Sequence, residues 1–472
     1  MKAGRTIALT LQLGLLLFVP YTRAQQPDTP PTQDPGADNG TPVQGEEVPT
    51  LARTPQNDRG PVSGVEDYRL DGLSLGRSFV TGKVQGRETY DTNTNNSATK
   101  SKASQDSVTN LLGSISLQKL ARTTALNLDY SGALFFYARG SLSYGTAHKF
   151  NVTEKFYLRR WTVLLGNDFS FLPESAGGLG GLGFGGGLPG LGGGLTNYNP
   201  FLLPGQSFQS LGKRINNVIV GQVQYTVGPR SSFNLSGNYG LVHFFTVGLL
   251  NSRSVGMRVG YDYLIDARQT FTLAYNNDFF NYSSAIPGFS THSAVVAYKR
   301  FLTGRLSFLM EGGPQISRFQ NPVSGNATSL SWRLRSQLRR LTARNSLELE
   351  YSHHITAGSG VLIGANSDIL RTDFSRTLSR NWTGGLLGSF NRNSGLRQTS
   401  GGNSSRHSNS WTAGTMIHRL VGERANIDLN YHISRQTANF SVCPGNVPCG
   451  SVSLRHQVGV GMTWSSRPYL ID

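Results

Sequence analysis

The residues of this chain most easily linked to chemistry are two adjacent histidines, His353 and His354. Imidazoles are common metal ligands and general bases, so the pair invites comparison with a metal site or a hydrolase. In a β-strand, however, successive side chains point to opposite faces, so the two cannot hold one ion together. Serine is abundant and no serine stands out as a nucleophile. We therefore predict no metal site and no enzyme, with a hydrolase as the weaker alternative.

A second candidate is the glycine-rich stretch Gly177–Gly194. A phosphate-binding loop would need a Gly-Lys-Ser/Thr sequence between a strand and a helix, and this stretch has neither. We predict a flexible loop and no bound cofactor.

The only two cysteines, Cys443 and Cys449, bracket the sequence Pro-Gly-Asn-Val-Pro. In an oxidising compartment such a pair forms a small disulfide, and no further ligands nearby suggest a metal site. We predict a disulfide between them.

Charged residues of both signs occupy one face of many alternating segments. The candidates on this face are Arg258, Lys299, Arg333, Arg335, Arg339, Arg371, Asp262, Asp278, Glu311, Glu348, Glu350 and Asp373, with Asp129, Asp168 and Asp428 on further segments. Because both signs are present, the net charge of +17 does not by itself predict a preference for anions. A solvated wall with local ion pairs is favoured over a specific ligand track.

The segments that position these residues are strands. From Ser231 to Tyr239, apolar or small residues alternate with polar ones, a period of two that indicates a strand with two unlike faces. The preceding run Val218–Val227 is joined to it by Gly-Pro-Arg, which predicts an antiparallel hairpin. The same unit recurs along the chain, and 57 glycines, 5 methionines and 37% hydrophobic residues fit a large helical core poorly.

The N-terminal region predicts export. Lys2 and Arg5 precede an apolar run from Ile7 to Val19, and cleavage after Ala24 would complete a signal peptide over residues 1–24. Residues 25–70 are rich in proline and poor in aromatic residues, so we expect a disordered segment. Residues 71–472 then form one β domain.

About eighteen strands can be counted in this domain, joined alternately by short and long connections. Short turns are expected at Leu120–Thr123, Asn151–Glu154, Val227–Arg230, Ile265–Arg268, Leu302–Arg305, Leu341–Arg344, Leu378–Asn381 and Leu420–Glu423. A soluble β-sandwich has no reason to sort its connections by length in this way.

The pattern resembles the porin-like outer-membrane β-barrels of Gram-negative bacteria from about Gly72 to Trp464. Such barrels end in an amphipathic strand with a terminal aromatic residue, which Val458, Val460, Met462 and Trp464 match, although Ser465–Asp472 extends beyond it. The resemblance implies an all-β, transmembrane antiparallel barrel with short periplasmic turns, long extracellular loops and aromatic girdles. Its partners would be outer-membrane lipid, the barrel-assembly machinery and small solutes, with no nucleic acid.

We therefore predict a channel for passive or weakly selective passage of small polar or charged solutes. An export pore for an anionic polysaccharide is one alternative, which a continuous inward track of arginine and lysine would favour. A non-conducting structural or adhesive barrel is another, which sealing of the lumen by Gly177–Gly194 would favour. A soluble sandwich is the third, and the sequence predicts no oligomeric state.

One hairpin permits a prediction of register. With its turn centred near Thr342-Ala343, Arg335 would lie opposite Glu350 and Gln337 opposite Glu348. Directly opposed charges on one face of a sheet should form pairs.

Overall fold

The computed structural model describes residues 78–95, 97, 103–140, 144–172, 213–245, 249–283, 287–319, 327–358, 362–396, 406–439, 442–443, 447–448 and 452–471. The chain divides into two units, Met1–Ala52 and Arg53–Asp472, and all described residues belong to the second. The predicted signal peptide, the proline-rich segment, the Gly177–Gly194 stretch and Cys449 lie outside the described residues. The predicted disulfide between Cys443 and Cys449 therefore stays a prediction.

No helix among these residues is long and apolar enough to cross a membrane.

The described part of the chain consists of strands. Their bounds are β1 (Phe79–Asp91), β2 (Asp106–Leu120), β3 (Thr124–Tyr137), β4 (Gly145–Tyr157), β5 (Trp161–Leu172), β6 (Arg214–Gly228), β7 (Ser231–Phe244), β8 (Ser252–Asp266), β9 (Gln269–Tyr282), β10 (Phe289–Thr303), β11 (Leu306–Phe319), β12 (Ala327–Leu341), β13 (Asn345–Thr356), β14 (Ala365–Ser379), β15 (Trp382–Gly395), β16 (His407–Val421), β17 (Ala425–Ala438), β18 (Val442–Cys443), β19 (Val447–Pro448), β20 (Val452–Ser465) and β21 (Tyr469–Leu470).

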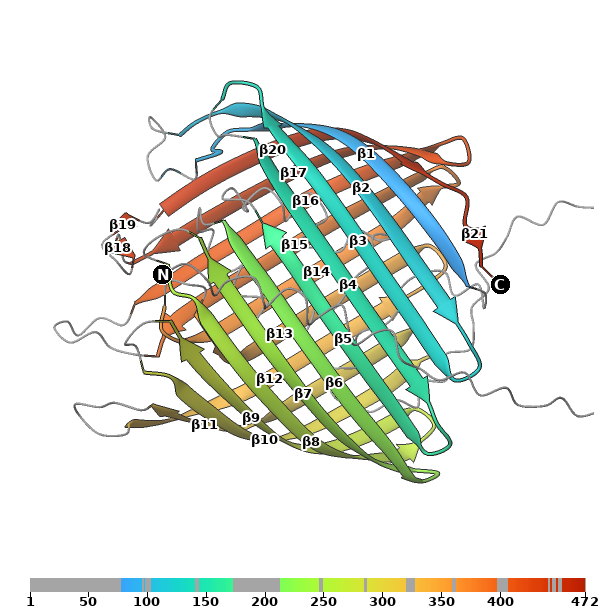
Figure 1. Cartoon of the computed structure of the whole chain (residues 1–472), viewed down its shortest axis with the longest axis vertical. Coiled ribbons are helices and arrows are strands. Elements are labelled where there is room, and N and C mark those ends of the chain that lie inside the picture. The colour runs from blue at the N-terminus through green and yellow to red at the C-terminus, as the bar shows by residue number, and fades with distance from the viewer. Residues whose placement is uncertain are drawn as a thin grey trace, which may run out of the picture. The chain divides into compact units, whose positions relative to one another are not determined.

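Eighteen of these strands, β1–β17 and β20, form one closed antiparallel ring (Figure 1). Each strand pairs with the next in sequence, and β20 returns to pair with both β17 and β1. The seam aligns Val84 with Trp464 and Asp91 with Gln457. Among the described barrel strands, closure leaves no edge strand, which is the condition for a sheet to survive in hydrocarbon. The pairing of β12 with β13 ends at Leu334 and His353, so the first residues of β12 pair with β11 alone. The predicted porin-like antiparallel barrel is confirmed, and the sandwich alternative is wrong because the barrel strands belong to one sheet rather than two.

The segment after Trp464 also joins the seam. In β21, Tyr469 pairs with Val80 and Leu470 pairs with Phe79. The residues that extend beyond the expected last strand therefore add a short piece of strand beside β1.

The two faces of each strand differ as the alternation predicts. In β8, Val255, Met257 and Val259 are 40%, 51% and 50% exposed, whereas Ser254 and Asp262 are 2% and 4% exposed. A row of well-exposed aliphatic side chains suits lipid rather than water. We call the face with the exposed apolar residues the outer face and the polar face the inner face.

One predicted turn is wrong, and the strand that the alternation suggests from Arg139 to Phe150 starts later, at Gly145. Asn151–Glu154 lies inside β4, and the turn follows at residues 158–160. Asn151 and Thr153 are buried on the inner face, so their polarity comes from the lining of the barrel and not from a turn. Arg139 and Gly140 belong to the connection before β4, where Gly140 has a φ of 65°.

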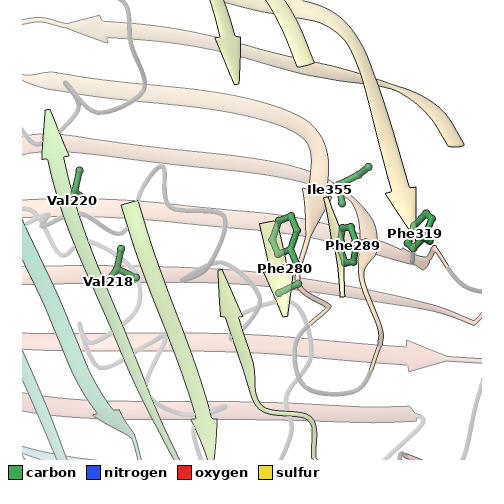
Figure 2. Close-up of a cluster of buried hydrophobic side chains, with 7 residues drawn as sticks. Val218, Val220, Phe280, Phe289, Phe319 and Ile355 are labelled. Carbon is green, nitrogen blue, oxygen red and sulfur yellow. The ribbon is translucent and has the colours of Figure 1, made fainter. Parts of the chain in front are cut away.

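A buried apolar cluster lies on the inner face near the ends of β9 and β11 and the start of β10 (Figure 2). The rings of Phe280 and Phe289 stack with centroids 4.6 Å apart, and Phe319 lies 5.2 Å from Phe289. Gly364, with a φ of 69°, approaches the Phe289 ring so closely that a Cβ would lie 2.8 Å from it. The inner face is thus packed with apolar rings at this rim, whereas the charged residues Arg258 and Glu311 lie farther along the strands.

Candidate functional site

The candidate site is the polar inner face of β8–β14, where all twelve predicted lumen residues lie. They are Arg258 and Asp262 on β8, Asp278 on β9, Lys299 on β10, Glu311 on β11, Arg333, Arg335 and Arg339 on β12, Glu348 and Glu350 on β13, and Arg371 and Asp373 on β14. Each occupies the strand parity opposite to the exposed apolar residues. Whether they line a path for solutes stays a prediction.

The centre of this sector is an ionic cluster of two arginines and two carboxylates. Arg258 donates through Nη1 and Nη2 to the two carboxylate oxygens of Glu311, at 3.1 and 3.0 Å. Arg333 lies 3.6 Å from Glu311 Oε1 through its Nε and 3.7 Å from Asp278 Oδ2 through its Nη1. The pairing balances the charges, so this part of the inner face has little net field of its own.

The ion pair between Arg258 and Glu311 spans the two strands that separate β8 from β11. On the first of these two strands, β9, Asn276 accepts a 3.1 Å hydrogen bond from Arg258 Nη1. Its own side-chain amide donates to Ser293 on the second, β10, at 3.1 Å. Side chains can meet across intervening strands in this way on the concave side of a curved sheet. The contact therefore supports the assignment of this face to the interior of the barrel.

A gap in the β10–β11 pairing lies beside the cluster. The register runs from Ser293–Gln315 to Val296–Gly312, and the two pairs between them are missing. Pro314 has no N–H to donate. A Cβ on Gly313 would overlap the backbone of Ala294, so a residue with a side chain does not fit there without a shift.

A second ionic pair joins β12 to β13, but in a different register from the prediction. Arg335 pairs with Ser352 and Gln337 pairs with Glu350 in the ladder, a shift of two residues. The predicted contacts still form along the diagonals, with Arg335 Nε 3.4 Å from Glu350 Oε1 and Gln337 Nε2 donating to Glu348 Oε1 at 2.9 Å. The directly opposed register is wrong, whereas both contacts are present.

The remaining candidates are distributed along the same face. Asp262 accepts hydrogen bonds from Asn234 Nδ2 at 2.7 Å and from Thr272 Oγ1 at 2.6 Å. Lys299 Nζ lies 5.1 Å from the centroid of the Phe301 ring. In the ladder, Arg371 lies opposite Glu350, and Asp373 lies opposite Glu348.

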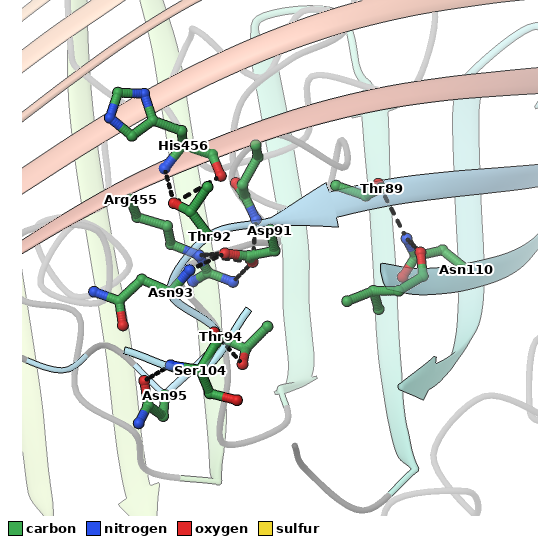
Figure 3. Close-up of polar contacts among 12 residues, drawn as sticks. Thr89, Asp91, Thr92, Asn93, Thr94, Asn95, Ser104, Asn110, Arg455 and His456 are labelled. Carbon is green, nitrogen blue, oxygen red and sulfur yellow. Dashed lines mark hydrogen bonds and ion pairs between the residues drawn. The ribbon is translucent and has the colours of Figure 1, made fainter. Parts of the chain in front are cut away.

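Two buried ion pairs lie at the seam, and the sequence predicted only one of their four residues. Arg455 on β20 donates through Nε to both oxygens of Asp91 on β1, at 2.9 and 2.8 Å, and Gln457 donates to Asp91 at 2.9 Å (Figure 3). Arg87 Nη2 lies 2.6 Å from Asp428 Oδ2. Only Asp428 was among the predicted residues, although the alternation around Arg455 carries the same signal.

Glycine on β20 makes the Arg87–Asp428 pair possible. Gly461 lies opposite Arg87 of β1 and also opposite Asp428 of β17. A Cβ there would lie 2.8 Å from Asp428 Oδ1 and 3.1 Å from Arg87 Nε. The two charged side chains therefore meet over a strand that offers no side chain at that point.

His353 and His354 lie on opposite faces, as predicted. His353 Nδ1 is 2.7 Å from Asp368 Oδ1, and Tyr351 on the same outer face donates to that oxygen at 2.9 Å. Within the described residues, no group of three or more His, Cys, Asp and Glu side chains is placed to hold a metal ion.

Comparisons with solved structures identify several similar proteins. No family model matches the chain, and no curated protein matches its sequence. The outer membrane protein OpdK from Pseudomonas aeruginosa is similar with a TM-score of 0.41 and 10% identity, over 82% of this chain and 99% of that chain. OccAB3 from Acinetobacter baumannii has a TM-score of 0.43 and 11% identity, over 83% and 100%. OccK2 (OpdF) from Pseudomonas aeruginosa, solved in complex with glucuronate, has a TM-score of 0.42 and 8% identity, over 83% and 99%.

Proposed function

We propose that this chain is an outer-membrane channel for the passive or weakly selective passage of small polar or charged solutes. The observation that carries the proposal is the closed ring of eighteen strands, β1–β17 and β20, with polar residues inside and apolar residues outside. Barrels of roughly sixteen to eighteen strands are wide enough to leave an aqueous passage. Weak selectivity follows from the ion pairs, because cations and carboxylates alternate along the inner face.

The export of an anionic polysaccharide is not favoured. Such a pore would present a continuous track of inward arginine and lysine. Arg87, Arg258 and Arg455 instead each contact a carboxylate, at Asp428, Glu311 and Asp91. A polyanion sliding along this face would meet both signs of charge.

A non-conducting surface barrel is the second candidate, favoured by the low exposure of the inner face. Arg258 is 8% exposed, Glu311 is 3% exposed and Asp91 is fully buried. Side chains that line a wide aqueous pore are expected to contact more water than this. The two candidates differ in whether solutes cross the membrane.

We further propose that the barrel lies in the outer membrane of a Gram-negative bacterium with its short turns toward the periplasm. The apolar outer face suits a lipid partner, and assembly of such a barrel would involve the barrel-assembly machinery. Both chain ends of the ring, at Phe79 and Ser465, lie at the short-turn end. A protease added to whole cells would then cleave at the long connections and spare the short turns.

Liposome swelling tests the channel proposal. Full-length protein is reconstituted into vesicles, which are then placed in isotonic solutions of neutral, cationic and anionic solutes of increasing size. We expect swelling with small solutes of all three kinds and a size cut-off, whereas vesicles with heat-denatured protein stay intact. Correctly folded protein that permits no swelling with any solute would identify the non-conducting barrel instead.

A further inference from the structure

The outer face carries a repeated pair of tyrosine and histidine. The pairs are Tyr130 with His148 at 3.0 Å, Tyr275 with His292 at 2.7 Å and Tyr431 with His456 at 2.9 Å, each between the hydroxyl oxygen and Nδ1. The ring centroids are 6.3 Å apart in all three pairs. A fourth tyrosine, Tyr351, donates to Asp368 in the corresponding place. Four strand pairs around the barrel therefore share one arrangement.

The four pairs occupy one level of the barrel. Each tyrosine follows the first residue of its strand by six positions, counted from Thr124 in β3, Gln269 in β9, Asn345 in β13 and Ala425 in β17. The partner lies diagonally on the next barrel strand, two residues nearer the long connection than the residue opposite the tyrosine. Each of these partners places a polar group among the apolar residues of the outer face at the same distance from the short turns.

Exposed arginines lie on the outer face toward the long connections. They are Arg253 on β8, Arg318 on β11, Arg392 on β15 and Arg435 on β17. Among the described residues, none of the four makes an ion pair. Their guanidinium groups are therefore available to an external anion.

Two of these arginines lie close to an aromatic residue and a tyrosine–histidine pair. Arg435 is opposite Trp411 of β16 in the ladder, and Trp411 is 36% exposed. Arg392 lies on β15, two positions beyond Phe390, the residue opposite Trp411. His456 of the Tyr431 pair lies on β20, two positions after Leu454, the residue opposite Arg435. These residues form one continuous surface on the barrel strands β15, β16, β17 and β20, which we call the β15–β20 patch.

The carboxylates nearest this surface already have donors. Asp368, opposite Arg392, accepts from Tyr351 and contacts His353. Glu88, on the outer face of β1, accepts from the hydroxyls of Ser107 and Thr109. Neither carboxylate forms an ion pair with Arg392 or Arg435, so both guanidinium groups keep their N–H donors for a ligand.

We propose that the β15–β20 patch, with Arg392, Arg435, Trp411 and the Tyr431–His456 pair, binds the phosphate-bearing headgroup of a lipid in the leaflet next to the long connections. Guanidinium groups bind phosphate oxygens through bidentate hydrogen bonds. Tryptophan and tyrosine favour the headgroup region of a membrane. The charge of the patch complements an anionic headgroup and not a zwitterionic one. The inference rests on the proposed membrane location but not on conduction.

Lipid binding to the full-length chain in detergent micelles tests this proposal, with native mass spectrometry as the measurement. The probes are phosphatidic acid and phosphatidylcholine with the same acyl chains, and inorganic phosphate as a competitor. We expect the chain to prefer phosphatidic acid, and the double variant Arg392→Gln, Arg435→Gln to weaken its binding roughly tenfold or more. The matched control is Arg253→Gln, Arg318→Gln, which removes the same charge from the outer face elsewhere and should leave the affinity nearly unchanged.

Three outcomes would overturn the lipid site. The chain could show no preference for phosphatidic acid, the two double variants could weaken binding equally, or inorganic phosphate at the concentration of the lipid could abolish the binding of phosphatidic acid. Liposome swelling is measured on the same variants and should not change. A chain that binds the lipid but never permits swelling would refute the channel proposal and leave the lipid site standing.

Discussion

Arg258 on β8 holds Glu311 on β11 through two hydrogen bonds, 3.1 and 3.0 Å long, across the two strands that lie between them. Both residues are buried, at 8% and 3% exposure, and the other cation in contact with Glu311, Arg333, is farther away at 3.6 Å. The pair ties together four consecutive strands of the barrel. It is the contact on which the ionic cluster of the inner face is built.

Arg258→Ala should therefore destabilise the barrel by about 3–5 kcal/mol, since it leaves Glu311 buried with only the longer contact to Arg333. The measurement is the free energy of unfolding by denaturant in reconstituted vesicles. The double variant Arg258→Ala, Glu311→Ala should recover part of the lost stability, because it removes the carboxylate that the single variant leaves buried without Arg258. Arg318→Ala, an exposed arginine of the outer face, is the control and should change stability by less than about 0.5 kcal/mol. A loss no larger for Arg258→Ala than for this control would refute the role of the pair.

Arg335 and Glu350 should set the selectivity of the pore in opposite directions, if the barrel conducts. Removing a positive charge from the lining favours cations, and removing a negative charge favours anions. Reversal potentials in a salt gradient should shift toward cation selectivity for Arg335→Ala and toward anion selectivity for Glu350→Ala. Arg340→Ala removes an exposed arginine from the outer face of the same strand and should cause no shift. Two unchanged potentials would reduce the Arg335–Glu350 contact to a structural ion pair.

Leu235 tests the assignment of the faces. It is 49% exposed on the outer face, so Leu235→Arg should cost about 2–4 kcal/mol if the residue lies near the middle of the membrane. Leu235→Phe, which stays apolar, is the control and should be nearly neutral. A folding assay in which the arginine is tolerated as well as the phenylalanine would place Leu235 in water. The inward neighbour Asn234 is 1% exposed, so an arginine there would not fit and makes a poor control.

Two glycines of neighbouring strands should respond differently to alanine. A Cβ on Gly260 would lie 2.6 Å from Asn234 Oδ1 and 2.8 Å from its Nδ2, whereas the nearest atom to a Cβ on Gly237 is 3.8 Å away. Gly260→Ala should displace the Asn234 amide from Asp262, at a cost of about 1–3 kcal/mol for the buried group left unsatisfied. Gly237→Ala should cost much less. Equal free energies of unfolding for the two variants would show that Asn234 is free to move at no cost.

The strand count and the two faces could be predicted from sequence because lipid and the lining impose opposite polarities at a period of two. This rule gave the inner parity of Asp428 and the outer parity of Leu235 without any knowledge of their neighbours. It failed at Asn151–Glu154, where polar residues of the inner face resemble a turn.

Register and long-range contacts could not be predicted in the same way. A slip of two residues between β12 and β13 preserves the faces, so the pattern cannot detect it. Here the turn is set by Thr342, which donates through its N and Oγ1 to the carbonyl oxygen of Asn345. The pair of Arg87 with Asp428 joins residues 341 positions apart and depends on closure of the ring and on Gly461 between them. No local pattern carries that information.

Single-channel recording in a planar bilayer tests the central claim most directly. Purified full-length protein is added at low concentration to one side of the membrane under a fixed voltage. We predict discrete conductance steps of uniform size, with only a weak preference between cations and anions because Arg258, Glu311 and their neighbours are paired. Folded protein that inserts into the bilayer and gives no steps would contradict the account of the barrel as a channel.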